Sequence, residues 1–95
     1  MPTIDEIKTK SNSVFAGYPI KKVSLFGSYA KGEQTNASDI DMVIHDSDLG
    51  ILELSNLIQQ LTDVLERNVD LVSYEDLSDV FKFLIKDEEI VIYEK

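Results

Sequence analysis

Hydrophobic residues recur at two different spacings along the chain, and the spacing changes several times. Apolar residues three or four positions apart, typical of a helix with one buried face, occur near the N-terminus, in the middle of the chain and near the C-terminus. Short apolar runs and alternating segments, typical of strands, lie between them. The pattern predicts helices over 4–16, over 50–67 and around Leu77, Val80, Phe81 and Leu84, and strands over 20–26, 39–44, 69–72 and 89–93.

Polar and turn residues mark the expected ends of the first helix. Thr3, followed three positions later by Glu6, forms a capping box that predicts a helix start at Ile4. Gly17 and Pro19 are expected to end this helix.

Similar signals divide the middle of the chain. A short helical turn near 28–31 is expected to end at Gly32, and the polar segment 33–38 to form a loop. Residues 45–48 predict a turn that also offers N-caps to the long helix, which Asn68 is expected to end.

The elements follow one another in the order αβ(α)βαβαβ. This order predicts an α+β (mixed α/β) fold, in which a small mixed sheet of about four strands packs against helices on one face and buries their apolar stripes. Ninety-five residues are enough for one domain, which we expect to span residues 1–95.

Composition limits the possible chemistry. The chain contains no cysteine, which excludes disulfides, thiolate metal sites and cysteine nucleophiles and fits a reducing compartment. No apolar run is long enough to span a membrane, and no basic segment precedes an apolar run at the N-terminus. We therefore expect a cytoplasmic protein with no membrane partner.

The chain is strongly acidic. Nine basic and eighteen acidic side chains give a formal net charge of −9, which argues against direct binding to a nucleic-acid backbone. This charge is compatible with a basic protein partner or with bound divalent cations, and also with solubility alone.

Asp39 and Asp41 are the first candidate site residues. Alternate strand residues project from the same face, so these carboxylates lie side by side, with Cα atoms about 6.5–7 Å apart, and repel each other. A shared hard cation removes the conflict, and Mg²⁺ prefers oxygen ligands with water or phosphate completing its shell. Asp70, on the next strand, is a third carboxylate that could help to bind a second ion and to orient or deprotonate an attacking hydroxyl.

Gly27 and Ser28 stand where a strand passes into a helical turn. A glycine lets a phosphate approach the backbone closely, and the Ser28 hydroxyl and following amides can donate hydrogen bonds to it. A phosphate site one loop away from a metal-binding strand suits a metal-bound nucleoside triphosphate. Each feature alone also fits an ordinary solvated strand end or turn, and the lone His45 is expected to be a solvated strand-end residue.

The arrangement of these residues resembles a known family. Gly27-Ser28, ten further residues and then Asp39-Ile40-Asp41 is the pattern of the DNA polymerase β-like nucleotidyltransferase superfamily. The fuller segments Leu25–Gly32, Val69–Val72 and Ile90–Glu94 resemble its minimal nucleotidyltransferase (MNT) domains, including the MntA-type antitoxins of HEPN/MNT toxin–antitoxin systems.

The resemblance implies an activity. Such antitoxins are encoded beside HEPN toxins, usually ribonucleases, and silence them by transferring AMP from ATP to a toxin tyrosine. By similarity Asp39 and Asp41 would bind Mg²⁺, with two ions expected, and Asp70 would complete the metal site and activate the tyrosine hydroxyl. Gly27 and Ser28 would hold the triphosphate.

Two positions depart from the pattern. Lys31, a further candidate for nucleotide binding, stands where many members carry Arg, and lysine keeps the charge but lacks the bidentate fork. Glu89 stands where a glycine commonly precedes the last strand.

Two other functions stay open. One is a non-catalytic antitoxin that neutralises its partner by occlusion. The other is a small-molecule nucleotidyltransferase, although enzymes of that kind normally carry an extra helical domain for the acceptor.

Overall fold

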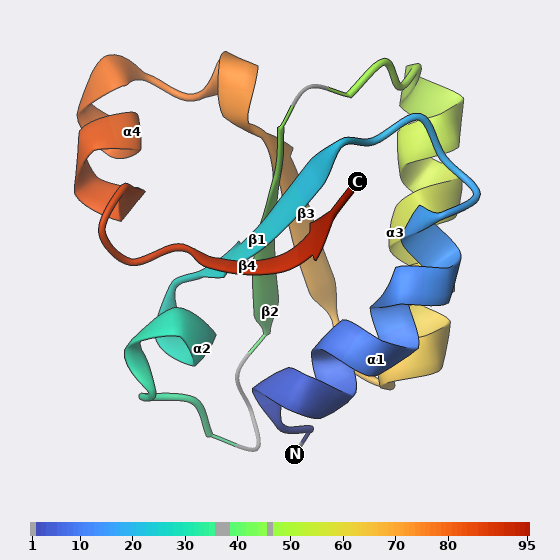
Figure 1. Cartoon of the computed structure of the whole chain (residues 1–95), viewed down its shortest axis with the longest axis horizontal. Coiled ribbons are helices and arrows are strands. Elements are labelled where there is room, and N and C mark those ends of the chain that lie inside the picture. Colours follow the sequence, from blue (N-terminus) through green and yellow to red (C-terminus); the bar gives the residue numbers. More distant parts are fainter. Residues whose placement is uncertain (1, 36–38, 46) are drawn as a thin grey trace.

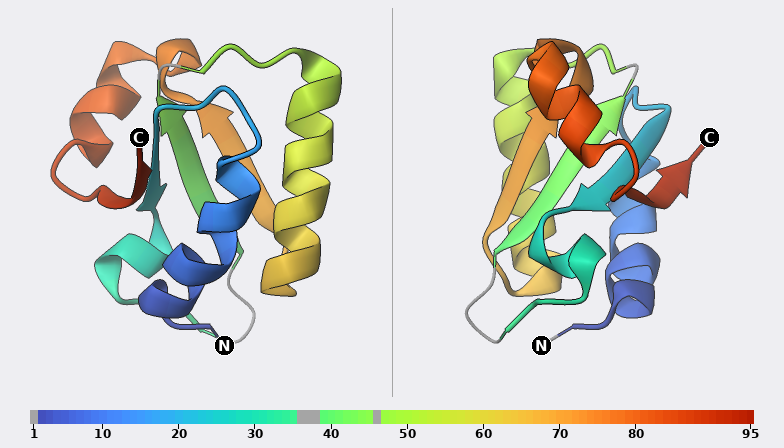
Figure 2. Two further views of the ribbon diagram at one scale, coloured as in Figure 1. Left: turned by 45° about the vertical axis from the view of Figure 1, so that its right-hand side comes forward. Right: turned by 90° about the vertical axis from the view of Figure 1, so that its left-hand side faces the viewer.

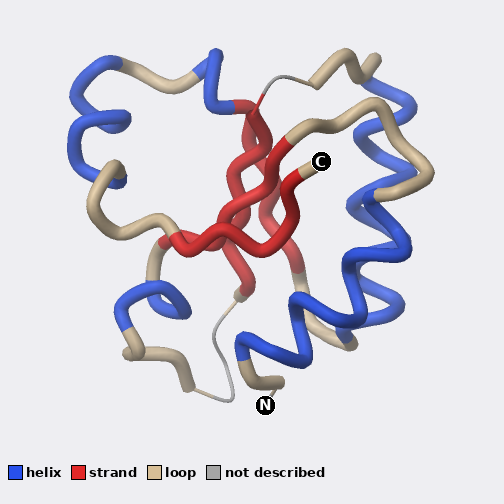
Figure 3. The backbone as a smooth tube through the Cα atoms, viewed as in Figure 1, coloured by secondary structure: helices blue, strands red, loops and turns tan. Residues whose placement is uncertain are grey.

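The computed structural model describes residues 2–35, 39–45 and 47–95 (Figures 1 and 3). The element order is the predicted one, with an additional 3-10 helix, η1, after the third strand. The elements are α1 (Ile4–Phe15), β1 (Lys22–Phe26), α2 (Ser28–Lys31), β2 (Ile40–His45), α3 (Ile51–Leu65), β3 (Val69–Ser73), η1 (Tyr74–Asp76), α4 (Asp79–Ile85) and β4 (Ile90–Glu94).

The four strands form one mixed sheet in the order β3-β2-β1-β4. β1 pairs antiparallel with both β2 and β4, whereas β2 and β3 are parallel. A parallel pair needs a crossover, and here α3 provides it. The predicted α+β fold with a small mixed sheet is therefore confirmed.

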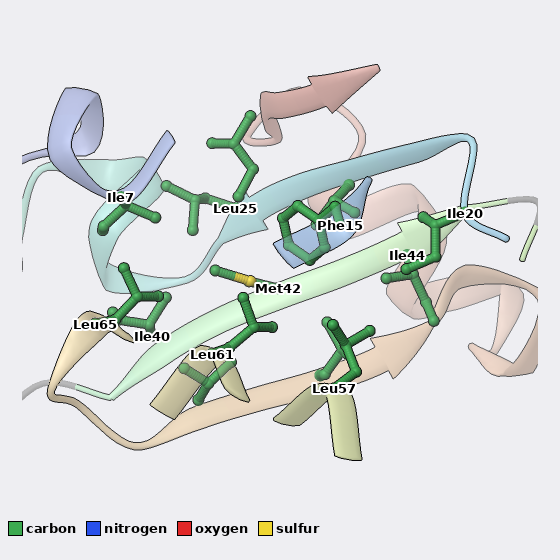
Figure 4. Packing of buried hydrophobic residues seen from close by; sticks show 14 of the residues in the cluster. Ile7, Phe15, Ile20, Leu25, Ile40, Met42, Ile44, Leu57, Leu61 and Leu65 are labelled. Atoms are coloured by element: carbon green, nitrogen blue, oxygen red, sulfur yellow. The ribbon is translucent and has the colours of Figure 1, made fainter. Parts of the chain in front are cut away.

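The main core lies between the sheet and the helices α1 and α3, which pack side by side on one face (Figure 4). Strand residues at alternate positions, such as Ile40, Met42 and Ile44 of β2, are fully buried there. Leu57 and Leu61 of α3 meet them from the helical layer. The amphipathic stripes predicted for these two helices are thus largely buried, as expected.

The ends of α3 differ from the prediction. The N-cap of α3 is Gly50 and not a residue of the predicted turn over 45–48. The backbone amide of Gly50 donates a hydrogen bond to the Glu53 carboxylate. Asp46 of that turn lies outside the described residues. The helix ends at Leu65 rather than at Asn68, because Glu66 adopts a left-handed conformation with φ 55°.

Helix α4 contradicts the expectation that the helices pack on one face. It lies on the other side of the sheet from α1 and α3 (Figures 1 and 2). Its apolar stripe is not buried either: Val80 is 70 % exposed and Leu84 60 %. Periodicity identified the helix, but it does not determine which layer a helix joins. Within the described residues, no helix is both long and apolar enough to cross a membrane.

Candidate functional site

A glycine turn ends β1 and begins α2. Gly27 has φ 71° and ψ −143°, a conformation that side chains with a Cβ strongly disfavour, and Gly32 closes the helix with φ 72°. The predicted short helix over 28–31 is therefore confirmed. The turn places α2 beside β1 and β2 (Figure 1).

Gly27 lies directly against Asp41. A Cβ added to Gly27 would stand 2.6 Å from Oδ2 of Asp41, closer than non-bonded atoms approach. The glycine is thus required both by its backbone angles and by the position of this carboxylate.

Asp41 and Asp70 are neighbours in the sheet. They are register partners in the parallel β2–β3 pair, and such strands lie about 4.8 Å apart. Both point away from the α1–α3 core, because Ile40, Met42 and Leu71, next to them along the strands, are buried in it. Two carboxylates distant in sequence therefore lie side by side.

Phe26 places this pair on the side of the sheet where α4 lies. Phe26 is the register partner of Asp41 on β1. Its ring meets Phe81 of α4 edge-on, with centroids 5.8 Å apart. The carboxylates and α4 therefore share one face of the molecule.

The environment of Asp41 is unfavourable for a negative charge. Burial raises the pKa of Asp41 above its ordinary value of 3.8, and the charges of Asp70 and Asp39 and a hydrogen bond with the Asp70 side chain raise it further. Asp39, just before β2, is exposed and still close enough for its charge to act on Asp41. The structure thus brings the three predicted aspartates into one electrostatic group.

These residues fit a divalent cation chemically. All three offer carboxylate oxygens, the ligands that Mg²⁺ prefers, and a cation would relieve the repulsion acting on Asp41. In the described ranges, however, no group of three or more acidic, histidine or cysteine side chains is already arranged around a common metal position.

The remaining predicted residues lie on α2. Ser28 is its first residue, directly after Gly27, and is half-buried. Lys31 ends the helix and pairs with Glu88, with 3.8 Å between Nζ and Oε2 and both side chains well exposed. This pair links α2 to the segment between α4 and β4.

His45 is not the solvated residue that we expected from the sequence. Its side chain is only 13 % exposed, and Nε2 lies 2.7 Å from Oε1 of Glu89. The ring stacks on Tyr74 of η1 with centroids 4.4 Å apart. Glu89, where the family pattern commonly has glycine, therefore connects the end of β2 to the segment before β4. The two residues are distant in the sequence, and no local sequence signal indicates this contact.

The fold is that of the nucleotidyltransferases. A solved structure, provisionally described as a minimal nucleotidyltransferase, superposes on this chain with a TM-score of 0.79. The two sequences are 25 % identical, and the match covers 94 % of this chain and 95 % of that one. The chain belongs to the polymerase beta nucleotidyltransferase family, whose model matches residues 9–95.

Two further relatives carry more specific descriptions. A Methanocaldococcus jannaschii protein, provisionally named protein adenylyltransferase MJ0435, is 34 % identical over 88 residues, covering 92 % of this chain and 95 % of the relative. A crystal structure described as a toxin-antitoxin with AMP-PNP is similar with a TM-score of 0.79 and 26 % identity, covering 93 % of this chain and 73 % of that chain.

Proposed function

We propose that this nucleotidyltransferase is a magnesium-dependent protein adenylyltransferase and an antitoxin. It would transfer AMP from ATP to a tyrosine of a HEPN toxin. The observation that carries the proposal is the register pairing of Asp41 with Asp70 beside Gly27, with the charge of Asp39 acting on the same group. The provisional name of the archaeal relative and the toxin-antitoxin description of the structural neighbour support the acceptor class.

The residues divide the work between binding and proton transfer. Gly27 leaves room for the triphosphate, the Ser28 hydroxyl donates to a phosphate oxygen, and Lys31 adds a positive charge at the end of the same helix. Asp39, Asp41 and Asp70 would hold the metal, which would supply charge stabilisation to the phosphates.

Asp70 is the more exposed partner of the Asp41–Asp70 pair and is the proposed general base. It accepts the proton of the tyrosine hydroxyl, whose oxygen forms a bond to the α-phosphorus of ATP. The bond from that phosphorus to the bridging oxygen breaks, and pyrophosphate leaves with the bonding electrons.

The test is to incubate the chain with ATP, Mg²⁺ and the HEPN protein encoded beside it, and then to measure the mass of the HEPN protein. We expect a mass increase of one or more AMP units on tyrosine. Asp39→Asn/Asp41→Asn is expected to abolish the increase. Asp48→Asn, which removes a carboxylate from the loop before α3, serves as the matched control with wild-type transfer.

A second candidate function is neutralisation by binding alone. The observation that favours it is the exposed apolar surface of α4, with Phe83 66 % and Leu84 60 % exposed, which is suited to covering a partner. The double aspartate variant separates the two functions. If it neutralises the toxin as well as wild type at equal complex stability, occlusion and not transfer is the mechanism.

A further inference from the structure

The surface of α4 is the part of the molecule that the proposed chemistry leaves unexplained. Half of the large apolar side chains exposed in the described part of the chain, four of eight, belong to this short helix. Val80, Phe83 and Leu84 occupy positions i, i+3 and i+4, so they share one helix face, and they are 70 %, 66 % and 60 % exposed. We call these three residues the α4 patch.

The α4 patch is distinct from the residues that attach the helix to the sheet. Ile85 is buried, and Phe81 contacts Phe26 of β1. The patch residues lie on the adjoining face and keep most of their surface in water. Burial of such a side chain is worth about 1.5–3 kcal/mol, so leaving three together in solvent is unusual unless another molecule covers them.

The contact between Phe81 and Phe26 connects the patch to the candidate site. Phe26 is the register partner of Asp41, so a single residue separates the inner side of α4 from the carboxylates. The opposite face of the sheet is covered by α1 and α3 (Figure 2). A protein seated on α4 would therefore lie on the same side of the sheet as Asp41 and Asp70.

The charge around the patch indicates what such a protein should look like. The segment over residues 74–89 contains more acidic residues than lysines, and its lysines are Lys82 and Lys86. The ammonium groups of both lysines lie over aromatic rings, Lys82 over Tyr74 at 5.0 Å and Lys86 over Phe83 at 4.6 Å from the centroid. The segment that carries the apolar surface is thus mainly acidic, which complements a basic surface on the partner.

We infer that the α4 patch is the docking surface for the acceptor protein. The acceptor would present an apolar centre surrounded by Lys and Arg, and docking would bring its hydroxyl to the carboxylates. This inference rests on the proposed function and adds to it the surface that selects the substrate. Docking and chemistry would then depend on different residues of the chain.

The test compares Phe83→Gln/Leu84→Gln with the control Ile51→Gln/Leu52→Gln. The control removes two similarly exposed apolar side chains, 83 % and 77 % exposed, from the start of α3. Glutamine is neutral and a good helix former, so neither variant changes the net charge or is expected to unfold the chain. The probes are the adjacent HEPN protein for docking, by calorimetry, and AMP-PNP with Mg²⁺ for the nucleotide site.

We expect the α4 variant to weaken HEPN binding at least tenfold and to raise KM for the HEPN protein by a similar factor, with little change in kcat and wild-type AMP-PNP binding. The control should bind and react as wild type. Unchanged HEPN binding by a folded α4 variant overturns the inference and leaves the proposed function standing. If wild type binds the HEPN protein through the patch but never transfers AMP, the proposed function is wrong, while the inference that the patch is a docking surface still holds. If the chain alone forms a dimer and the α4 substitutions dissociate that dimer, a second copy of the chain covers the patch, and the inference is also overturned.

Discussion

Gly27 and Asp41 are packed so closely that a Cβ on the glycine would stand 2.6 Å from Oδ2 of the aspartate. The turn between β1 and α2 and the first carboxylate of β2 therefore fix each other's positions. This contact joins the part of the site proposed to hold phosphate to the part proposed to hold the metal.

Gly27→Ala is expected to slow transfer by on the order of 100-fold and to destabilise the chain. The added methyl group would displace the Asp41 carboxylate, and misplacement of a reacting group by about 1 Å typically costs on the order of 100-fold in rate. The backbone angles add a strain of about 1–3 kcal/mol. Thermal unfolding and the rate of AMP transfer measure the two effects.

Gly32→Ala is the matched control for this strain. Gly32 also has positive φ, 72°, but no described atom beyond its neighbours in the chain lies within 4 Å of the point that an added Cβ would occupy. We expect a loss of stability of about 1 kcal/mol and nearly normal transfer. Equal loss of transfer in both variants would show that the contact with Asp41 has no special role.

Asp41→Asn is expected to stabilise the metal-free protein while abolishing transfer. It removes a charge that is repelled by Asp70 and Asp39, and like charges opposite each other in a sheet cost a few tenths to about 1 kcal/mol. For a chain of this size the melting temperature should rise by up to about 6 °C in EDTA. A lower melting temperature would mean that the carboxylate stabilises the fold.

The pH dependence of this difference follows from the raised pKa of Asp41. The folded protein holds the Asp41 proton more tightly than the unfolded chain does. The contribution of Asp41 to the free energy of unfolding therefore falls as pH rises from 3.8 through the raised pKa, and it is constant above that pKa. The advantage of Asp41→Asn over wild type in EDTA should therefore be full at neutral pH and shrink as pH falls toward 3.8. Denaturant titrations of both proteins at several pH values measure it, and a difference independent of pH contradicts it.

Magnesium is expected to stabilise wild type more than the variants that lack Asp41, and so to reverse the order of stability expected in EDTA. A cation bound by the three aspartates stabilises the folded state according to its concentration relative to Kd. Wild type should gain several degrees in melting temperature at millimolar Mg²⁺ with AMP-PNP. Asp39→Asn/Asp41→Asn should gain little, and an equal gain would place the ion elsewhere.

Lys31→Ala is expected to raise KM for ATP about three- to tenfold with stability unchanged within about 0.5 kcal/mol. The pair between Lys31 and Glu88 is exposed and 3.8 Å long, so it contributes little to folding. Lys31→Arg should restore KM. Glu88→Gln, which frees the lysine, should leave KM the same or lower, and a rise would mean that the ion pair itself positions α2.

The helices α1 and α3 and all four strands could be predicted because their apolar spacing is regular. The pairing of Asp41 with Asp70 could not be derived from spacing alone, since it depends on strand order and on the parallel register of β2 with β3. The family resemblance anticipated that these residues converge.

Other features depended on contacts that no local pattern contains. His45 and Glu89 are 44 positions apart, and their pairing buries a histidine that we expected to be solvated. The left-handed residue that ends α3 is Glu66, a residue type that gives no such signal. The layer that α4 joins was also undetermined, because a hydrophobic stripe is equally suited to covering a sheet or a partner.

The parallel pairing of β2 with β3 has a consequence for how the protein matures. Asp41 and Asp70 become neighbours only after α3 has crossed over the sheet and brought β3 into register, the closure of a long loop. A nascent chain that has emerged only as far as α3 lacks Asp70 and cannot assemble the acidic group. Enzymatic turnover would therefore require that synthesis has passed β3 and that β3 has paired with β2.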